Sequence, residues 1–197
     1  MALIRSVVVG DRVIDLHKFF GEVVDEKKWS TTQVSGGGGG YNVGSGHNNP
    51  VTISSVTQTH DQFFLKSDDG HELAVEMTDA GLALRKGHRV TVFWGILQGQ
   101  ERGPYIAIYN QTTNDVTKME PAILNLTAKP ASGLVMLAWI ASIFGICFYG
   151  LGIIGIVALF IAGGKRKAKS KEQADTLRTA LDGAIAEAKS AQGASNA

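Results

Sequence analysis

The chain has 197 residues, a formal net charge of +1 and a single cysteine, Cys147. One cysteine excludes an intrachain disulfide framework and a cysteine-based zinc site. A net charge this small gives the chain as a whole no strong electrostatic footprint.

The charged residues divide the chain into three regions. Residues 1–130 carry 12 basic and 14 acidic side chains, residues 164–197 carry 7 and 4, and residues 131–163 carry none. We therefore predict a β-rich soluble domain over residues 1–128, a membrane segment over residues 131–163 and a basic, amphipathic helical tail over residues 164–197. The N-terminus lacks the apolar core of a signal peptide, so we expect that this domain is not exported through a cleaved signal.

The first predicted element is a short helix over residues 11–20. Val13, Leu16 and Phe20 share a helical face there, Asp11 can cap the start and Gly21 can end the helix. A strand through residues 7–14 remains an alternative. Residues 21–34 are rich in valine, threonine and tryptophan, and they favour one or two strands.

A glycine-rich stretch over residues 35–50 follows. It offers little to bury and loses much conformational entropy if it is ordered, so we predict a long flexible loop between two strands. It does not match a nucleotide-binding loop. Ser45 follows Gly44 where a phosphate loop needs lysine, and no Gly-x-Gly-x-x-Gly register is present.

The chain from residue 51 to residue 119 has an all-β pattern. Asp69-Gly70 lies between two apolar runs, which indicates a β-hairpin, and Leu73, Val75 and Met77 alternate on one face of its second strand. Further strands are predicted over residues 89–94, 105–110 and 116–119. Short strands at this spacing make the predicted fold class mainly β: a small β-barrel or sandwich, followed by a transmembrane helical segment and an amphipathic C-terminal helix.

The apolar segment over residues 134–161 is longer than one bilayer span. As a straight helix it measures about 42 Å, whereas the hydrocarbon core is about 30 Å thick. Either one helix protrudes from the bilayer, or the segment breaks near residues 148–152 into a hairpin with legs over residues 131–147 and 151–167. We favour the hairpin narrowly, because it keeps the N-terminal domain and the tail on the cytoplasmic side without a signal peptide.

Small residues four positions apart occur in this segment. Such pairs let helix backbones approach closely and indicate helix–helix contact, although small residues are also common in membrane helices. The candidate contact residues are Ala138, Ala141, Ser142, Gly145, Ala158 and Ala162.

A basic block follows the apolar segment. Lysine and arginine near a membrane segment prefer the cytoplasmic side and attract anionic lipid head groups. Beyond the block, Leu177, Leu181, Ile185 and Ala188 form one face of a helix predicted over residues 172–190, which is either solvated or in contact with the membrane. The predicted surface anchors are Lys165, Arg166, Lys167, Lys169 and Lys171.

The sequence contains no recognisable catalytic or metal-binding pattern. None of the five histidines pairs at the helical spacing of zinc ligands, and Ser45 lacks the Gly-x-Ser-x-Gly context of a nucleophile. His60 beside Asp61, and His71 near Asp69, could meet across strands. We predict that the protein is not an enzyme and has no catalytic residue, no cofactor and no metal.

Aromatic residues near basic ones raise the alternative of a nucleic-acid binder. Four aromatics on predicted strands could form a stacking platform, as in small five-stranded oligonucleotide-binding barrels, or they could fill the core. The slightly acidic domain makes nucleic acid an unlikely partner. The four aromatics are Phe63, Phe93, Tyr105 and Tyr109, with Arg85, Lys86, Arg89 and Arg102 nearby in sequence.

The function predicted from these patterns is that of a membrane-anchored interaction or adaptor module, integral to the membrane with its soluble domain in the cytoplasm. Its expected partners are the lipid bilayer, anionic lipid head groups, and a protein partner or a second copy of the chain. Two alternatives stay open: a membrane-tethered barrel that binds nucleic acid or a small ligand, and a self-assembling membrane component.

Overall fold

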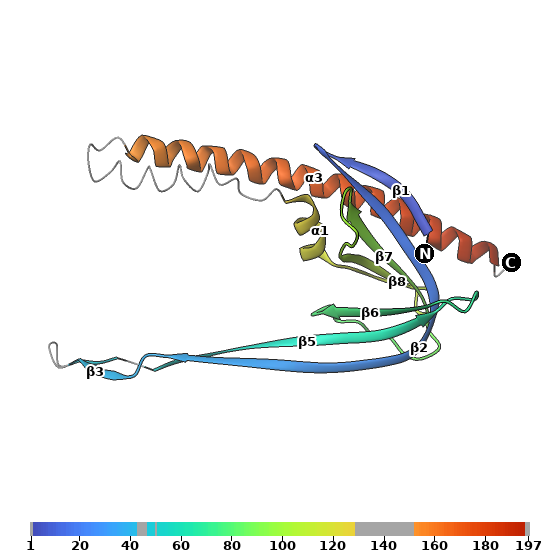
Figure 1. The fold of residues 1–197 in the computed structure, drawn as a ribbon, viewed down its shortest axis with the longest axis horizontal. Helices are drawn as coiled ribbons and strands as arrows, with labels where there is room; N and C mark the ends of the chain where they lie inside the picture. The colour runs from blue at the N-terminus through green and yellow to red at the C-terminus, as the bar shows by residue number, and fades with distance from the viewer. Residues whose placement is uncertain (1, 43–46, 50, 129–151, 196–197) are drawn as a thin grey trace. The chain divides into compact units, whose positions relative to one another are not determined.

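The computed structural model of the chain describes residues 2–42, 47–49, 51–128 and 152–195, and these residues are mainly β, as predicted (Figure 1). The strands and helices are β1 (Ala2–Val9), β2 (Arg12–Gly37), β3 (Gly40–Asn42), β4 (His47–Asn49), β5 (Thr52–Lys66), β6 (Glu72–Thr78), β7 (Arg89–Leu97), β8 (Tyr105–Asn110), β9 (Asp115–Lys118), α1 (Glu120–Thr127) and α3 (Gly152–Ser195).

Seven of the strands form one sheet in the order β6-β5-β2-β7-β8-β9, with β1 also paired to β2. The strands β3 and β4 form a separate two-stranded sheet. A barrel closes only when its first and last strands pair. Among the described strands β6 and β9 end the order without pairing to each other, so the predicted closed barrel is wrong and the sheet is open.

Asp11 lies in a turn and residues 12–20 form the start of β2, so the predicted helix over residues 11–20 is wrong. The chain turns at Gly10, which has a φ of 67°, and β1 then pairs with β2 in antiparallel register, with Val7 opposite Ile14. Ile14 and Leu16 are both buried, two positions apart. Residues 12–20 form a strand although their apolar residues also have a helical spacing, because β1 pairs with them. This pairing was not evident from the sequence.

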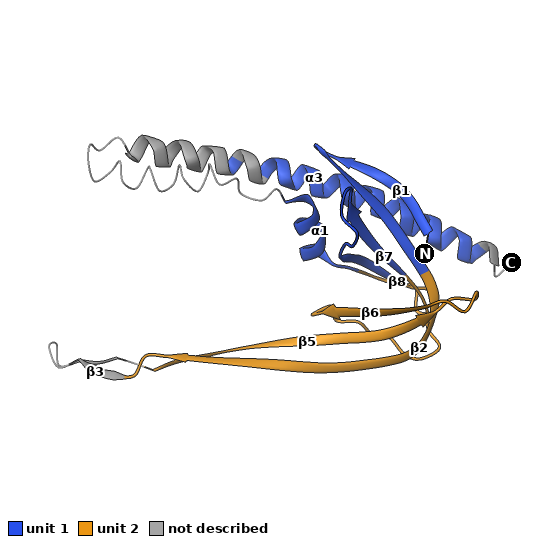
Figure 2. Ribbon diagram, viewed as in Figure 1, with its two compact units in different colours: residues 1–19, 92–108, 118–197 blue, residues 20–91, 109–117 orange. Residues whose placement is uncertain are grey.

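The chain forms two compact units (Figure 2). Because β2, β7 and β8 contribute residues to both, neither unit is one continuous stretch of sequence. The predicted domain limits stay predictions. Unit 1 comprises Met1–Phe19, Val92–Ile108 and Lys118–Ala197, and unit 2 comprises Phe20–Thr91 and Tyr109–Thr117.

Unit 2 contains the predicted hairpin, which is confirmed. β5 and β6 are antiparallel with Lys66 opposite Glu72, and the turn between them carries Gly70 at a φ of 81°. On β6, Val75 and Met77 are buried while the residues between and beside them are exposed. The alternation seen in the sequence therefore does mark the face that packs into the core of this unit.

Unit 1 packs α1 and α3 against strands. α1 contacts α3, and α3 contacts β1. The predicted stripe of the tail is buried within unit 1, with Leu177 and Leu181 both at 0 % exposure. The expectation that this face is solvated or in contact with the membrane is therefore wrong, because α1 and β1 cover it. The helix itself is longer than predicted: it begins at Gly152 and runs to Ser195, so neither the basic block nor Gly183 interrupts it.

Three ion pairs join α3 to other elements of unit 1. Each is partly exposed to solvent, so each stabilises the fold by only about 0–1 kcal/mol, and the apolar stripe carries most of the docking. The guanidinium of Arg178 donates hydrogen bonds to Glu120 and to Asp175. These bonds raise its pKa, and the bond to Glu120 has the larger effect. The nitrogen–oxygen distances are 2.6 Å for Arg5–Glu187, 2.5 Å for Lys118–Asp182 and 2.6 Å for Arg178–Glu120.

The predicted membrane segment lies largely outside the described residues, which omit 129–151. Its last part, from Gly152 onward, forms the first turns of α3. Of the helices within the described ranges, none is both long and apolar enough to cross a membrane.

Candidate functional site

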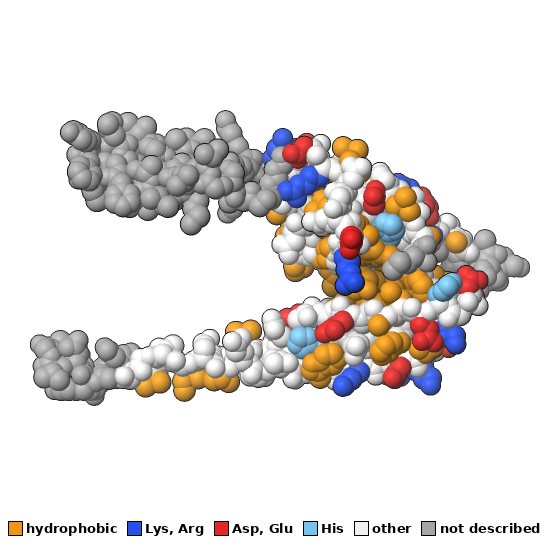
Figure 3. All heavy atoms as spheres, in the orientation of Figure 1, with side chains coloured by type: hydrophobic (Ala, Val, Ile, Leu, Met, Phe, Trp, Pro, Cys, Tyr) orange, Lys and Arg blue, Asp and Glu red, His pale blue; other side chains and the backbone are white. Residues whose placement is uncertain are grey.

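The clearest candidate site is an exposed two-stranded ribbon in unit 2. We call residues 30–37 of β2 and residues 52–58 of β5 the ribbon arm. The pairing register between the two strands runs without a break from Asp25 opposite Phe64 to Gly37 opposite Thr52. Every residue of the arm is exposed, so neither face of it is covered by another described part of the chain (Figures 1 and 3).

The composition of the arm explains why it forms strands. Threonine, valine and isoleucine are β-branched and favour extended backbone. Across the ribbon, the hydroxyl oxygens of Thr32 and Thr57 lie 2.9 Å apart in a hydrogen bond. An isolated two-stranded hairpin is only marginally stable in water, so the arm depends on the rest of the sheet to hold its base.

The base of the arm is fixed by two side-chain pairs on opposite faces. On one face, the Lys28 ammonium lies 3.0 Å from the Asp61 carboxylate, which is buried. On the other face, the Trp29 and His60 rings stack at 5.2 Å between centroids. The Lys28 side chain is 53 % exposed, so this ion pair contributes only about 0–1 kcal/mol. Together with the stacked rings it orders the base from which the exposed strands extend.

The arm exposes apolar side chains on a stretch without charge. Val34, Ile53 and Val56 are 65 %, 71 % and 59 % exposed, and orange side chains mark the arm in Figure 3. No aspartate, glutamate, lysine or arginine occurs from Trp29 to His60. Natural exposed edges are usually protected by lysine, proline or a bulge. The arm has none of these over residues 30–37 and 52–58.

The outer edge of β5 becomes free where β6 ends. β6 pairs with β5 as far as Thr78 opposite His60. One step further, the Asp79 amide donates to the Thr59 carbonyl at 2.7 Å, and the Asp79 carboxylate accepts from the Thr59 amide at 2.8 Å. Within the described residues no strand covers this edge from Gln58 to Thr52.

The predicted aromatic platform is not exposed. Phe63, Phe93 and Tyr109 are each 1 % exposed and belong to the core, as the alternative interpretation expected. Tyr105 is partly buried with its ring edge against Trp94, and burial raises the pKa of its phenol. These four side chains therefore offer nucleic-acid bases no stacking surface among the described residues.

The histidines that could meet carboxylates across strands have other contacts in the structure. His60 stacks on Trp29 and lies 3.5 Å from the Thr78 hydroxyl. The backbone amide of His71 donates to the Ser67 hydroxyl oxygen at 3.2 Å in the turn between β5 and β6. Both arrangements are local packing contacts, and neither brings a nucleophile and a base together.

Two of the predicted lipid anchors, Lys169 and Lys171, are exposed on α3, whereas the side chains of residues 165–167 lie outside the described ones. Ala158 and Ala162 are in the helix α3, again without described side chains, and the remaining small residues fall within 129–151. Most members of both predicted sets therefore lie outside the described residues or side chains, and both sets stay predictions.

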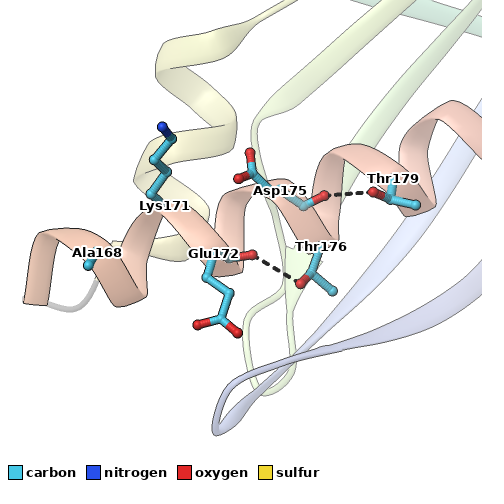
Figure 4. A pocket seen from close by; sticks show the side chains of 6 residues that line it. All are labelled: Ala168, Lys171, Glu172, Asp175, Thr176 and Thr179. Carbon is cyan, nitrogen blue, oxygen red and sulfur yellow. Dashed lines mark hydrogen bonds between the residues drawn. The ribbon is translucent and has the colours of Figure 1, made fainter. Parts of the chain in front are cut away.

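A depression of about 520 Å³ on α3 carries no site (Figure 4). Its lining residues, from Ala168 to Thr179, all belong to this one helix. Two of them are threonines whose hydroxyls donate to the carbonyls of Glu172 and Asp175 one turn earlier, as the dashed lines show. Ligand sites are concave and enclose most of a ligand, which the surface of one helix cannot do.

No protein-family model, no curated protein and no solved structure matches this chain. Function therefore has to be inferred from the geometry of the arm and from the way α3 is docked.

The sequence pattern predicted strands on both sides of the glycine run, and β2 and β5 confirm them, but it did not reveal that they pair as an exposed arm. Residues 35–50 were predicted as a loop, yet β2 extends to Gly37 and the short strands β3 and β4 continue the hairpin. The signal that could have found it is the absence of charge from Trp29 to His60, together with β-branched residues on both sides of the glycine run.

Proposed function

We propose that the protein is a membrane-anchored interaction module whose ribbon arm binds a protein partner by strand addition. The observation that carries this proposal is the arm itself, which is exposed on both faces, uncharged and open along the outer edge of β5. An extended partner strand gains backbone hydrogen bonds along such an edge, and exposed side chains such as Ile53 add apolar contacts.

The anchoring part of the proposal rests on the charge-free segment over residues 134–161. The described residues on its two sides lie in the same unit, since Glu120 of α1 and Arg178 of α3 form an ion pair at 2.6 Å. A single crossing would leave these two residues on opposite sides of the bilayer. The contact therefore supports a hairpin that enters and leaves the membrane on one side.

The part of the apolar segment that the structure describes lies in α3. From Gly152 to the first lysine, Lys165, it measures about 20 Å at 1.5 Å per residue, whereas a full crossing needs about 30 Å. The proposed hairpin therefore includes both a full-depth pair and a shallow, re-entrant pair. The basic block then lies at the surface, and its charge favours the cytoplasmic leaflet.

The hairpin predicts that the arm and the end of α3 are on the same side of the membrane. In a Cys147→Ser background, we expect Ser35→Cys and Ser190→Cys both to resist an impermeant thiol reagent in intact cells and both to react once the cells are opened. Labelling of only one of the two in intact cells would show a single crossing.

The interaction role predicts that the arm is occupied in native membranes. A photo-crosslinking residue at Ile53, which is exposed in the isolated chain, is expected to give a discrete protein adduct. The same residue at Ala186, on the exposed face of α3, is the matched control and should give none. Equal and diffuse labelling from both positions would contradict a specific role for the arm.

A further inference from the structure

We infer that the partner strand on the β5 edge is the β5 strand of a second copy of this chain. This inference rests on the proposed function and specifies its partner. The two arms pair in antiparallel orientation about a two-fold axis at Ser55, so that Ile53 of one copy lies opposite Thr57 of the other. The resulting four-stranded sheet joins the two ribbons edge to edge.

The direction of the backbone groups determines which residues of β5 can pair. Thr59 directs both its amide and its carbonyl toward Asp79, on the outer side of β5. In a regular strand every second residue points the same way, and the register with β2 has no bulge along this stretch. Ile53, Ser55 and Thr57 therefore direct their amide and carbonyl groups outward.

These three residues are symmetric about Ser55, and symmetry is what an isologous dimer requires. In a two-fold antiparallel pair, Ser55 faces Ser55 while Ile53 and Thr57 exchange hydrogen bonds in both directions. The odd-numbered side chains of both copies then lie on one face, so Val34, which is opposite Ser55 on β2, continues that face across the new sheet. A heterologous pairing would leave part of the edge open.

Charge complementarity selects a neutral partner. The arm, residues 30–37 and 52–58, contains no aspartate, glutamate, lysine, arginine or histidine, so phosphate groups, anionic head groups and acidic or basic peptides find no counter-charge on it. Burying their charges beside Val34 and Ile53 would cost free energy without a compensating ion pair. A second arm is neutral, rich in β-branched residues and matched in length.

The β5 edge is favoured over the β2 edge by composition. Residues 52–58 contain Ile53 and Val56 and no glycine, whereas the β2 part of the arm ends in Gly36 and Gly37. Glycine weakens strand pairing because it has no side chain to pack and loses more conformational freedom. Two copies anchored in the same bilayer also have a raised effective concentration, which favours a pair that is weak in solution.

Oxidative cross-linking of the purified full chain, in detergent and in a Cys147→Ser background, tests the pairing. Opposed Cα atoms of a hydrogen-bonded pair lie about 5.5 Å apart, which a disulfide can bridge. Ser55→Cys is expected to form about tenfold more covalent dimer than Ser54→Cys, whose side chain lies on the other face and is offset from the axis. Covalent dimer from Val34→Cys in place of Ser55→Cys would overturn the inference in favour of the β2 edge.

A measurement of the oligomeric state without cross-linking provides the second part of the test. Light scattering should give a dimer for the unmodified chain and for Ser54→Lys, and a monomer for Ser55→Lys, because the latter places two like charges across the axis. If every variant stays monomeric and no cysteine cross-links, the inference fails. An adduct of another protein at Ile53 in native membranes would then keep the proposed function, whereas no adduct there would remove both.

Discussion

Replacing Leu181 by aspartate is expected to release α3 from unit 1. Leu181 is 0 % exposed and lies in the middle of the buried stripe, next to Leu177, also at 0 % exposure. The change removes a buried leucine and puts an unpaired charge in its place. We expect the free energy of unfolding to fall by at least about 3 kcal/mol, since lost packing and charge burial act together.

Two separate measurements on the full chain in detergent test this prediction. Chemical denaturation gives the free energy of unfolding, and limited proteolysis of the native protein reports whether α3 is released. A released α3 should be cut between residues 171 and 190 under conditions in which the unmodified protein is intact. Ala186→Asp is the matched control because it puts the same charge on the exposed face of the same helix. Its effect should stay within about 0.5 kcal/mol. Equal effects from both substitutions would show that the stripe does not hold α3.

The docked α3 is also the physical basis of the proposed hairpin topology. The ion pairs between α3 and the rest of unit 1 are partly exposed, so alone they hold it only weakly. The buried stripe supplies the larger part, and it holds α3 against α1 and β1. The apolar segment follows α1 in the sequence. Releasing α3 from unit 1 removes the contact that favours a hairpin over a single crossing. A substitution in the core, Leu181→Asp, is therefore expected to weaken the preference for the proposed hairpin topology.

The parts of the fold that the sequence predicted are those with a local signal. The Asp69-Gly70 turn and the alternation on β6 specify a hairpin by neighbours in sequence. The stripe from Leu177 to Ala188 marks a helix face in the same way, although the surface that buries it, on α1 and β1, was not predicted. Such patterns depend on a few adjacent residues, so they need no knowledge of distant partners.

The parts that were missed depend on residues far apart in the sequence. Residues 11–20 have a helical spacing of apolar side chains, but residues 12–18 pair with β1 and therefore form a strand. The ribbon arm forms because residues before the glycine run pair with residues after it. The helix α1 was not predicted. It has only eight residues, with Pro121 in its first turn, where proline is tolerated.

Replacing Gly103 by alanine is expected to destabilise unit 1 through its backbone. A Cβ atom at Gly103 would overlap the carbonyl oxygen of Gly95 and approach the Cα atom of Ile96 to 3.0 Å. No side-chain rotation relieves this contact, because the obstructing atoms are backbone. β7 and β8 must separate, and the hydrogen bond from the Gly95 amide to the Pro104 carbonyl, at 3.2 Å, is lost.

We expect this substitution to cost about 3 kcal/mol, at the upper end of the range for overpacking. Gly37→Ala is the control, because a Cβ atom there meets nothing within 4 Å, and its effect should stay within about 0.5 kcal/mol. The two midpoints of chemical denaturation give the comparison. A Gly103→Ala protein as stable as the control would mean that β7 and β8 are further apart than described.

Gly95 connects the spacing of β7 and β8 to the position of α1. A Cβ atom at Gly95 would lie 2.9 Å from a methyl group of Leu126 and 3.1 Å from a methyl group of Ile14. The absent side chain thus lets α1 rest directly on β7 and β2. Separation of β7 from β8 should therefore also displace α1, and with it the point at which the chain leaves unit 1 toward the membrane segment. We expect Gly103→Ala to break the ion pair between Glu120 and Arg178. Faster proteolysis of α3 would detect this change.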